Sequence, residues 1–394
     1  MKLLFATDHR FEIAPDGEVF TLGGKYPYHL WTRNYLDVFD EMVVMGRGGE
    51  MVSPPGRLST SSGPNVRHRL LGSLRGAKRI FEVSGHAKVV DEEVAKADVV
   101  IARLPSELGM MACQSARRRG KPYLIEVVAS AWDGLWNHGS LAARAYAPVL
   151  ERRTAAAVAK APLALYVTQS FLQEAYPSKG ETWAVSDVAL EPVSDATIQR
   201  RMARIDHGEG PLTFGTIGSL VSRMKGVHVA LSALGRVKDQ LPPFVYRVLG
   251  EGDPSPYVAM ARDLGLEHRV AFDGVLPGGG PVAEWLDGVD VYLQPSFQEG
   301  LPRALIEALS RGCRAAASTV GGNPELLPAD RLHKVGDVAG LATTLLIIAG
   351  QDAAAAGAES HRSFETAGNY QAQHLAVRRR AAFAALRKMG ENHA

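Results

Sequence analysis

QPSFQEGLPRALIEALSRG, residues 294–312, follows directly on the largely apolar run 289–293. A short apolar run bounded by turn-forming residues is typical of a buried strand. The loop after it is marked by three such residues, Pro295, Ser296 and Gly300. Pro302 suits the first helical position, where its missing N–H is no loss, and Gly312 suits the position just past a helix end. The stretch therefore predicts a strand, a loop and a helix whose N-terminus opens at the loop.

Two carboxylates frame this predicted helix start, Glu299 in the loop and Glu307 inside the helix. The apolar stripe of the helix consists of Leu305, Ile306 and Leu309. Arg303 and Glu307 lie away from that stripe, which allows a solvated face with an i,i+4 ion pair worth roughly 0.3–0.5 kcal/mol at most. Against this, arginine before glutamate is the weaker order, and a cation in the first turn opposes the helix dipole. A helix N-terminus also offers free N–H groups to an anion, so these residues alone leave both interpretations open.

The order of motifs around this stretch resembles one known family. The chain carries, in this order, EGLP at 299–302, EALSRG at 307–312 and STVGGNPE at 318–325. Together they resemble the signature of the retaining GT-B glycosyltransferases of the family 4 type (glycosyl transferases group 1), in which seven residues separate the two glutamates. The resemblance implies an α/β protein with the GT-B fold, two Rossmann-like domains with a cleft between them. We expect an acceptor-binding domain at 1–190, a nucleotide-sugar-binding domain at 191–370, and a C-terminal helix at 371–394 that crosses back to the first domain.

Length and composition are consistent with two globular domains. A chain of 394 residues is too long for one ordinary core, and 46% hydrophobic with 22% charged residues is typical of a folded protein. The net charge of +2 makes no case for a nucleic-acid partner. Cys113 and Cys313 are far apart and indicate neither a disulfide framework nor a metal site. The N-terminus lacks the apolar length of a signal peptide, and no run of about 18 apolar residues occurs. We therefore expect a cytoplasmic protein, with the inner face of the membrane as an alternative.

The first half opens with a pattern of the Rossmann type. An apolar run at 3–7, an amphipathic stretch at 28–39 and a second apolar run at 42–45 predict a strand, a helix and a strand. Gly23 and Gly24, in the intervening loop, either allow a ligand to approach the backbone or form an ordinary turn. The resemblance assigns this loop to the side of the donor phosphate and the acceptor.

A predicted strand at 123–128 runs into a loop that holds Asp133 and His138. Ligands of open α/β sheets bind at the carboxyl ends of strands, so these two side chains suit sugar or acceptor hydroxyls. The alternative is a loop fixed by Trp132 and Trp136, with Asp133 as a helix cap. The family often has a histidine close to this strand end, whereas the histidine here comes later.

Residues 50–79 are polar and contain a loose basic cluster, Arg67, Arg69, Arg75, Lys78 and Arg79. Such a cluster is typical of a solvated surface. The functional alternative is attraction to an anionic acceptor or to an anionic membrane face, that is, a peripheral membrane contact.

The second predicted domain opens with a strand and loop at 212–226. This segment resembles the family's donor-phosphate loop, in which a lysine before a glycine stands at a helix start, as Lys225 does here. Lys225 beside free helix N–H groups suits a diphosphate that leaves as an anion. The family commonly has an arginine after the first glycine of this loop, Gly218, where this chain has Ser219. We take Arg223 as a hypothetical replacement for that cation.

Two further predicted strands, 244–249 and 270–272, end on the same expected ligand side of the sheet. Gly250 follows the first of them, and Val275 and Leu276 lie shortly after the second. The resemblance implies that the backbone near Val275 and Leu276 contacts the nucleotide base.

The resemblance also implies the reaction, transfer of a hexosyl group from a nucleotide-diphosphate sugar to a hydroxyl acceptor with retention of configuration. Glu307 would bind the ribose, Glu299 would favour positive charge at the anomeric carbon, and Lys225 would stabilise the leaving diphosphate. The backbone would assist at Gly300, Leu301, Pro302 and Arg303. Neither a cofactor nor a metal is expected, since the chain has no Asp-x-Asp pair. The expected acceptor is a glycan or a lipid-linked glycan in surface polysaccharide or glycoconjugate biosynthesis. The alternatives are a non-catalytic nucleotide-sugar-binding module and a GT-B nucleotide-sugar epimerase.

Overall fold

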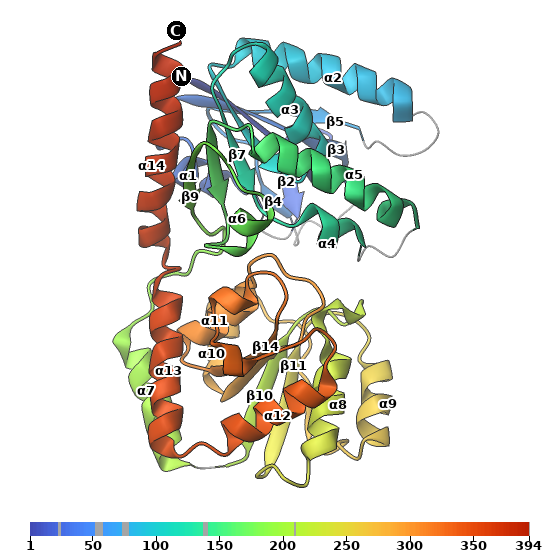
Figure 1. The fold of residues 1–394 in the computed structure, drawn as a ribbon, viewed down its shortest axis with the longest axis vertical. Helices are drawn as coiled ribbons and strands as arrows, with labels where there is room; N and C mark the ends of the chain where they lie inside the picture. The colour runs from blue at the N-terminus through green and yellow to red at the C-terminus, as the bar shows by residue number, and fades with distance from the viewer. Residues whose placement is uncertain (23–24, 52–57, 73–78, 137–140, 209, 394) are drawn as a thin grey trace. The chain divides into compact units, whose positions relative to one another are not determined.

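The structure is a computed structural model, and it describes all residues except 23–24, 52–57, 73–78, 137–140, 209 and 394. The described residues form two compact units. Unit 1 consists of Met1–Val185 and Ala376–Ala394, and unit 2 consists of Ser186–Leu375. Each unit is built on one mainly parallel β-sheet that carries helices on its faces (Figure 1).

The strands of unit 1 are β1 (Lys2–Ile13), β2 (Val19–Leu22), β3 (Glu41–Glu50), β4 (Leu58–Thr60), β5 (Val66–Leu71), β6 (Val99–Leu104), β7 (Tyr123–Val127), β8 (Leu163–Tyr166) and β9 (Glu181–Ala184). Their order is β4-β2-β1-β6-β7-β8-β9, and β3 pairs with both β1 and β5. β1 has parallel neighbours on both sides, β3 and β6. Residues 3–6 of β1 are fully buried, as expected of a parallel strand covered on both faces.

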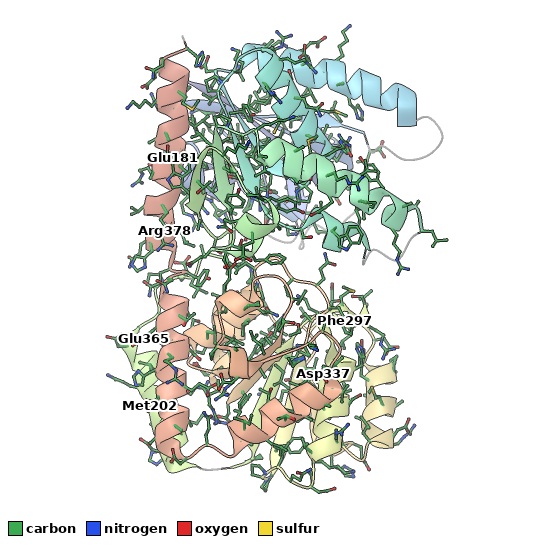
Figure 2. All side chains as sticks on the ribbon, viewed as in Figure 1. Glu181, Met202, Phe297, Asp337, Glu365 and Arg378 are labelled. Atoms are coloured by element: carbon green, nitrogen blue, oxygen red, sulfur yellow. The ribbon has the colours of Figure 1, made fainter. Side chains whose placement is uncertain are left out.

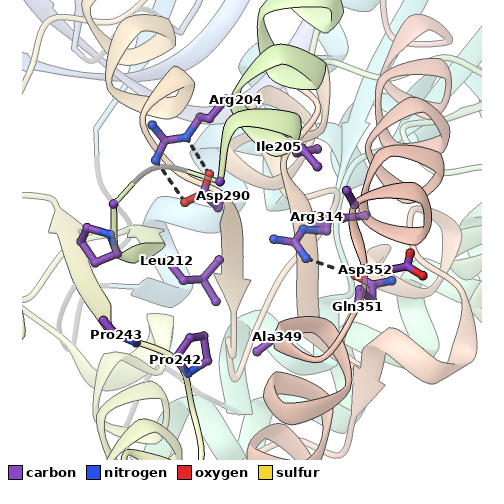
Figure 3. Close-up of a pocket in the computed structure, with 15 residues that line it drawn as sticks. Arg204, Ile205, Leu212, Pro242, Pro243, Asp290, Arg314, Ala349, Gln351 and Asp352 are labelled. Atoms are coloured by element: carbon purple, nitrogen blue, oxygen red, sulfur yellow. Dashed lines mark hydrogen bonds and ion pairs between the residues drawn. The ribbon is translucent and has the colours of Figure 1, made fainter.

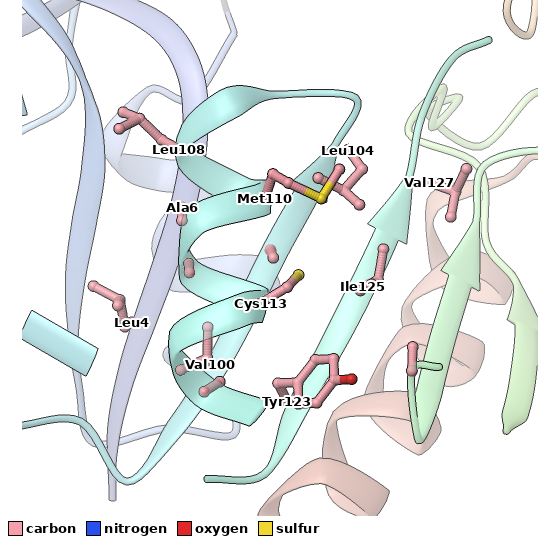
Figure 4. Close-up of a cluster of buried hydrophobic side chains, with 14 of the residues drawn as sticks. Leu4, Ala6, Val100, Leu104, Leu108, Met110, Cys113, Tyr123, Ile125 and Val127 are labelled. Carbon is pink, nitrogen blue, oxygen red and sulfur yellow. The ribbon is translucent and has the colours of Figure 1, made fainter. Parts of the chain in front are cut away.

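The helices of unit 1 are α1 (Tyr28–Asn34), α2 (Arg79–Lys96), α3 (Glu107–Arg118), α4 (Ala131–Trp136), α5 (Leu141–Val158), α6 (Phe171–Ala175) and the greater part of α14 (Ala372–Glu391). One face of the sheet is covered chiefly by α2, α3 and α5. Figure 4 shows this core, with Leu108, Met110 and Cys113 of α3 among the strand residues Leu4 and Ile125. Apolar residues of α3 recur on the face that meets the sheet, which explains why this segment is a buried helix.

The other face of the sheet carries an aromatic cluster. The rings of Phe5 and Trp31 lie 5.3 Å apart, and Tyr35 stacks on Phe383 of α14 at 5.2 Å. Arg380 of α14 also pairs with Asp37 at 2.5 Å. The C-terminal helix is thus attached to unit 1 by both apolar and charged contacts.

The strands of unit 2 are β10 (Leu212–Ile217), β11 (Phe244–Leu249), β12 (Val270–Phe272), β13 (Val291–Gln294), β14 (Arg314–Ser318) and β15 (Leu332–His333). They pair in the order β12-β11-β10-β13-β14-β15, and every pairing is parallel. This is the strand arrangement of a Rossmann-like domain.

The helices of unit 2 are α7 (Asp195–His207), α8 (Val227–Val237), α9 (Ser255–Asp263), α10 (Gly280–Asp287), α11 (Arg303–Ser310), α12 (Val338–Ala349) and α13 (Ala353–Gly368). α8, α9 and α12 cover one face of the sheet, and α10, α11 and α13 contribute to the core on the other face (Figure 1). Within the described ranges, no single helix is long and apolar enough to cross a membrane. α12 and α13 meet that criterion only as a pair, and they are bent by 115° at their junction.

Residues 50–79 contain two strands that the sequence did not indicate. The sequence showed only a polar stretch with a basic cluster, and the structure has β4 and β5 in this segment. β5 reads VRHRLL, and its exposed and half-buried residues alternate because the strand lies at the margin of the sheet beside β3. Arginine and histidine in such a strand interrupt the apolar pattern by which a strand is recognised in a sequence.

Candidate active site

The strand order of unit 2 reverses at β10. β11 follows β10 in the chain and pairs with one side of it, while β13 pairs with the other side. Ligands of open α/β sheets bind outside the carboxyl ends of the strands at such a reversal. β10 ends at Ile217 and β13 ends at Gln294, so the loops that follow them, 218–226 and 295–302, are where a ligand site is expected.

These two loops are packed against each other. Gly226 has φ of +69°, and a Cβ atom at this position would lie 1.9 Å from the carbonyl oxygen of Pro295. The backbone N–H of Phe297 donates to the carbonyl of Met224 at 2.8 Å. Only glycine has the conformational freedom and the lack of side chain that this approach requires. The loop after β10 is therefore held in a fixed position relative to the loop after β13.

A partly buried ion pair joins the two loops. Lys225, the last residue of a 3₁₀ turn that leads into α8, places Nζ 2.7 Å from Oε1 of Glu299. The side chain of Glu299 is 8% exposed and that of Lys225 is 34% exposed. Nε2 of Gln294 donates to the same Oε1 at 2.5 Å and to Oγ of Ser296 at 2.9 Å. Two donors, one of them charged, thus fix the position of the Glu299 carboxylate.

The backbone of Glu299 is held from the other side by the GGNP segment. Gly321 has φ of +57°, and a Cβ atom there would lie 2.2 Å from the carbonyl oxygen of Glu299. The N–H of Gly322 donates to the carbonyl of Gly300 at 2.7 Å. The motifs EG and GG, recognised separately in the sequence, therefore form one packed unit around the carboxylate.

The helix that begins next to Glu299 is α11. Pro302 is its N-cap rather than its first helical residue, and no side chain caps the helix start. The first N–H groups of a helix have no partner within the helix, so the start of α11 can donate to an anion. Glu307, one turn inside α11, is 30% exposed and lies 4.0 Å from Arg303. Burial raises the pKa of Glu307 above its usual value, while the positive charge of Arg303 acts in the opposite direction.

The remaining donor-side residues lie around the ends of β10, β11 and β12. Gly218 and Gly250 are in contact, since a Cβ atom on Gly250 would lie 1.9 Å from the carbonyl oxygen of Gly218. The N–H of Gly250 donates to the carbonyl of Gly274 at 2.6 Å, which ties this contact to the segment that carries Val275 and Leu276. Val275 is exposed, and Leu276 packs in part against the core.

Ser219 and Arg223 occupy the loop between Gly218 and Lys225. Oγ of Ser219 accepts a hydrogen bond from the N–H of Val221 at 3.3 Å. Arg223 is exposed and has no ion-pair partner among the residues that the structure describes. Its guanidinium is therefore available to a ligand of this loop.

Sequence reasoning missed two side chains at this site. Gln294 is a buried polar residue at the end of an apolar strand, and that contrast was the available signal. His228, the second residue of α8, stacks on Phe297 with ring centroids 5.5 Å apart. Phe297 is labelled in Figure 2. Burial, followed by the charge of Arg223, lowers the pKa of His228, which favours the neutral form of this ring.

The predicted residues of unit 1 are only partly described. Gly23, Gly24 and His138 lie outside the described residues, and Asp133 is described only as part of the backbone of α4. The start of α4 is fixed by the N–H of Trp132, which donates to Glu151 at 2.9 Å. In the basic cluster, Arg67 forms an ion pair with Glu93 of α2, as an ordinary structural arginine does.

Metal-ligand types do not cluster in the described part of the chain. No group of three or more His, Cys, Asp or Glu residues there is arranged to hold a metal ion. Both cysteines are buried and form no disulfide, Cys113 in α3 and Cys313 before β14.

Comparison with known proteins identifies the family of these motifs. Residues 211–351 match the family described as Glycosyl transferases group 1. Protein CapJ of Staphylococcus aureus is 29% identical over 347 residues, which are 86% of this chain and 84% of CapJ. The putative colanic acid biosynthesis glycosyltransferase WcaL of Escherichia coli is 35% identical over 130 residues, 31% of each chain.

Solved structures share the complete fold. HepE of Anabaena, crystallised in complex with UDP, superimposes with a TM-score of 0.64 at 16% identity over 98% of this chain and all of that one. The lipopolysaccharide outer core galactosyltransferase WaaB gives the same TM-score and identity over 98% of this chain and 99% of that one. The predicted GT-B fold is therefore confirmed, and residues 211–351 resemble the glycosyl transferases group 1.

Proposed function

We propose that this glycosyltransferase moves a hexosyl group from a nucleotide-diphosphate sugar to a hydroxyl of a glycan or lipid-linked glycan, with retention of configuration, in surface polysaccharide or glycoconjugate biosynthesis. Support comes from WcaL and from AmsK of Erwinia amylovora, which are named for colanic acid and amylovoran biosynthesis. Further support comes from HepE, which was crystallised with UDP and with UDP-glucose.

The observation that carries the proposal is the Lys225–Glu299 pair at the strand reversal of unit 2. A cation and a carboxylate 2.7 Å apart, beside the uncapped start of α11, can act on a substrate that develops charges of both signs. Glycosyl transfer from a nucleotide sugar does this, because the diphosphate leaves as an anion while positive charge grows at the anomeric carbon.

Each part of the nucleotide sugar then has a proposed partner in the chain. Lys225 and the exposed Arg223 stabilise the leaving diphosphate, together with free N–H groups at the start of α11. Glu299, held by Gln294, favours positive charge on the sugar. Glu307 accepts hydrogen bonds from the ribose hydroxyls, and the backbone at 275–276 contacts the base.

The proposed mechanism uses cations of the chain in place of a divalent ion and needs no protein nucleophile. Attack by the acceptor hydroxyl on the face that the diphosphate leaves would give retention, with the leaving phosphate taking the hydroxyl proton. Acceptor binding is assigned to unit 1 through Gly23, Gly24, Asp133 and His138.

A donor panel without acceptor tests the proposal. The purified chain is incubated with UDP-, GDP- and ADP-sugars in the presence of EDTA, and free nucleoside diphosphate is measured. Slow release from one donor, abolished in Lys225→Met, supports a metal-independent transferase. Donor binding without any release would favour a non-catalytic binding module, and conversion of the sugar without release would favour an epimerase. The anomeric configuration of a transferred product, read by NMR, decides retention.

A further inference from the structure

A pocket lies in unit 2, at the end of the sheet opposite to Lys225 and Glu299. It has a volume of about 260 Å³ and is formed where β10 and β14 begin and where α12 meets α13 (Figure 3). Leu212 is the first residue of β10 and Arg314 is the first residue of β14, and both line the pocket. Because the strands are parallel, the donor site at their carboxyl ends and this pocket at their amino ends are separate.

Arg314 is one of the charged residues that line the pocket, with Arg204, Asp290 and Asp352 (Figure 3). It is 7% exposed, and its Nη1 donates to the carbonyl of Ile348 at 2.9 Å and to Oε1 of Gln351 at 3.2 Å. Both acceptors are neutral, and among the described residues no carboxylate lies within ion-pair distance of Arg314. A buried charge without a counter-charge is unfavourable. Burial accordingly lowers the pKa of Arg314, although Asp290 and Glu359 act in the opposite direction.

The nearest carboxylates are engaged by other arginines. Asp290 accepts from Nε and Nη2 of Arg204 at 2.7 and 3.1 Å and also pairs with Arg201 at 3.4 Å. Glu359 accepts from both Nε and Nη2 of Arg331 at 2.9 and 2.7 Å. The interior beside the pocket therefore holds more guanidinium groups than carboxylates, and Arg314 is the one left without an acidic partner in the described structure.

The rest of the lining restricts the kind of anion. Pro242, Pro243, Leu212 and Ala349 supply an apolar wall. Asp352, the N-cap of α13, adds a negative charge at the exposed rim, which disfavours a polyanion such as a diphosphate. The volume is below the range of about 300–1,000 Å³ that is usual for drug-sized ligands.

We propose that this pocket is a binding site for a small organic monoanion, whose carboxylate pairs with Arg314 while its compact apolar body packs on Pro242 and Pro243. Arginine and carboxylate match as a bidentate pair. The site would be distinct from the donor site and would take a ligand other than the nucleotide sugar.

The test uses the full chain with benzoate, acetate and inorganic phosphate as probes, followed by calorimetry and thermal denaturation. We expect benzoate to bind and to raise Tm more than acetate does, because only benzoate fills the apolar part. In Arg314→Met the affinity for benzoate should fall by about 10- to 100-fold, the loss of a charge-assisted contact. Arg262→Met, which removes an exposed arginine in the last turn of α9, is the matched control and should bind benzoate normally.

A second variant keeps the test decisive if the first is unstable. Arg314→Met removes one hydrogen-bond donor from the Ile348 carbonyl and one from the partly buried Gln351, whereas Ala349→Phe fills the pocket at a half-buried position and leaves Arg314 in place. Ala349→Phe should also abolish benzoate binding. The proposal is overturned if benzoate does not bind the unmodified chain, or if binding persists in Ala349→Phe. It is equally overturned if binding is lost in Lys225→Met, which would place the anion at the donor site.

Discussion

Replacement of Gln294 by leucine should separate activity from stability. Gln294 is 2% exposed, and its Nε2 donates to Glu299 at 2.5 Å and to Ser296 at 2.9 Å. Its Oε1, in contrast, is buried and has no hydrogen-bond partner among the described residues. A buried oxygen without a hydrogen-bond partner destabilises the folded state. We therefore infer that the role of Gln294 is to hold the carboxylate of Glu299 in position.

The magnitudes follow from these contacts. A hydrogen bond to a charged group contributes about 1.5–3 kcal/mol, so its loss should lower kcat by roughly 10- to 150-fold if Glu299 must be held in place for the transition state. For folding, Gln294→Leu loses two hydrogen bonds, which destabilises the protein. It also removes a buried oxygen without a partner, and such an oxygen costs the folded state about 1–3 kcal/mol. We therefore expect the free energy of unfolding of Gln294→Leu to stay within about 1.5 kcal/mol of the parent value.

The assay compares kcat and donor KM of the parent, Gln294→Leu and Ser296→Ala, with urea unfolding of each. Ser296→Ala is the matched control, since it removes the other acceptor of Nε2 and leaves the bond to Glu299. We expect a large loss of kcat only in Gln294→Leu, with KM changed by less than about threefold. A Gln294→Leu enzyme with the kcat of the parent would refute the positioning of Glu299 by Gln294.

The remaining predictions concern the cations, the loop contact and the second glutamate. Arg223→Ala should raise donor KM by roughly 10-fold through loss of a phosphate contact. Arg262→Ala, in the exposed last turn of α9, is the control and should leave donor KM unchanged. An Arg223→Ala enzyme with parental kinetics would show that Arg223 is not part of the site. Gly226→Ala places a Cβ atom against the Pro295 carbonyl at a position with left-handed backbone conformation, and it should lower Tm by about 5 °C or more. Gly278→Ala is the control, because a Cβ atom there meets nothing within 4 Å, and it should leave Tm nearly unchanged. Burial raises the pKa of Glu307 in the folded state, so its ionisation destabilises the fold once the pH exceeds the unfolded-state pKa. Glu307→Gln should therefore raise Tm at pH 7 and lose this advantage as the pH falls below about 4. The same variant should bind the donor more weakly at pH 7. A variant less stable than the parent at pH 7 would contradict the view that the buried charge of Glu307 destabilises the fold.

The stretch 294–312 was predictable because its signals are local. An apolar strand, turn residues and a helical stripe stand next to one another in the chain, and β13, the loop and α11 follow them closely. The fold class could be inferred from this stretch together with the resemblance of the glutamate motifs, and it is confirmed by HepE and WaaB. The proximity of Lys225 to Glu299 also follows from the strand order, since the loops after β10 and β13 adjoin.

Other features depend on contacts between distant residues and could not be read from the sequence. β5 was missed because Arg67, His68 and Arg69 interrupt its apolar pattern, although pairing with β3 makes it a strand. The sequence does not mark Arg314, because the strand start, the end of α12 and Gln351 come together around it only in the folded chain. Burial of a charge is a property of packing, and a periodic pattern does not reveal it.

The central claim is that Glu299 and Lys225 act together on the donor, and a double-mutant cycle tests it most directly. Transfer to acceptor, or donor hydrolysis in its absence, is measured for Glu299→Ala, Lys225→Met and the double variant, with Tm as the check on folding. We predict that each single variant loses at least about 100-fold in kcat and that the double variant is hardly worse, because the two groups serve one transition state. A folded Glu299→Ala enzyme that transfers sugar at the parental rate would contradict this account.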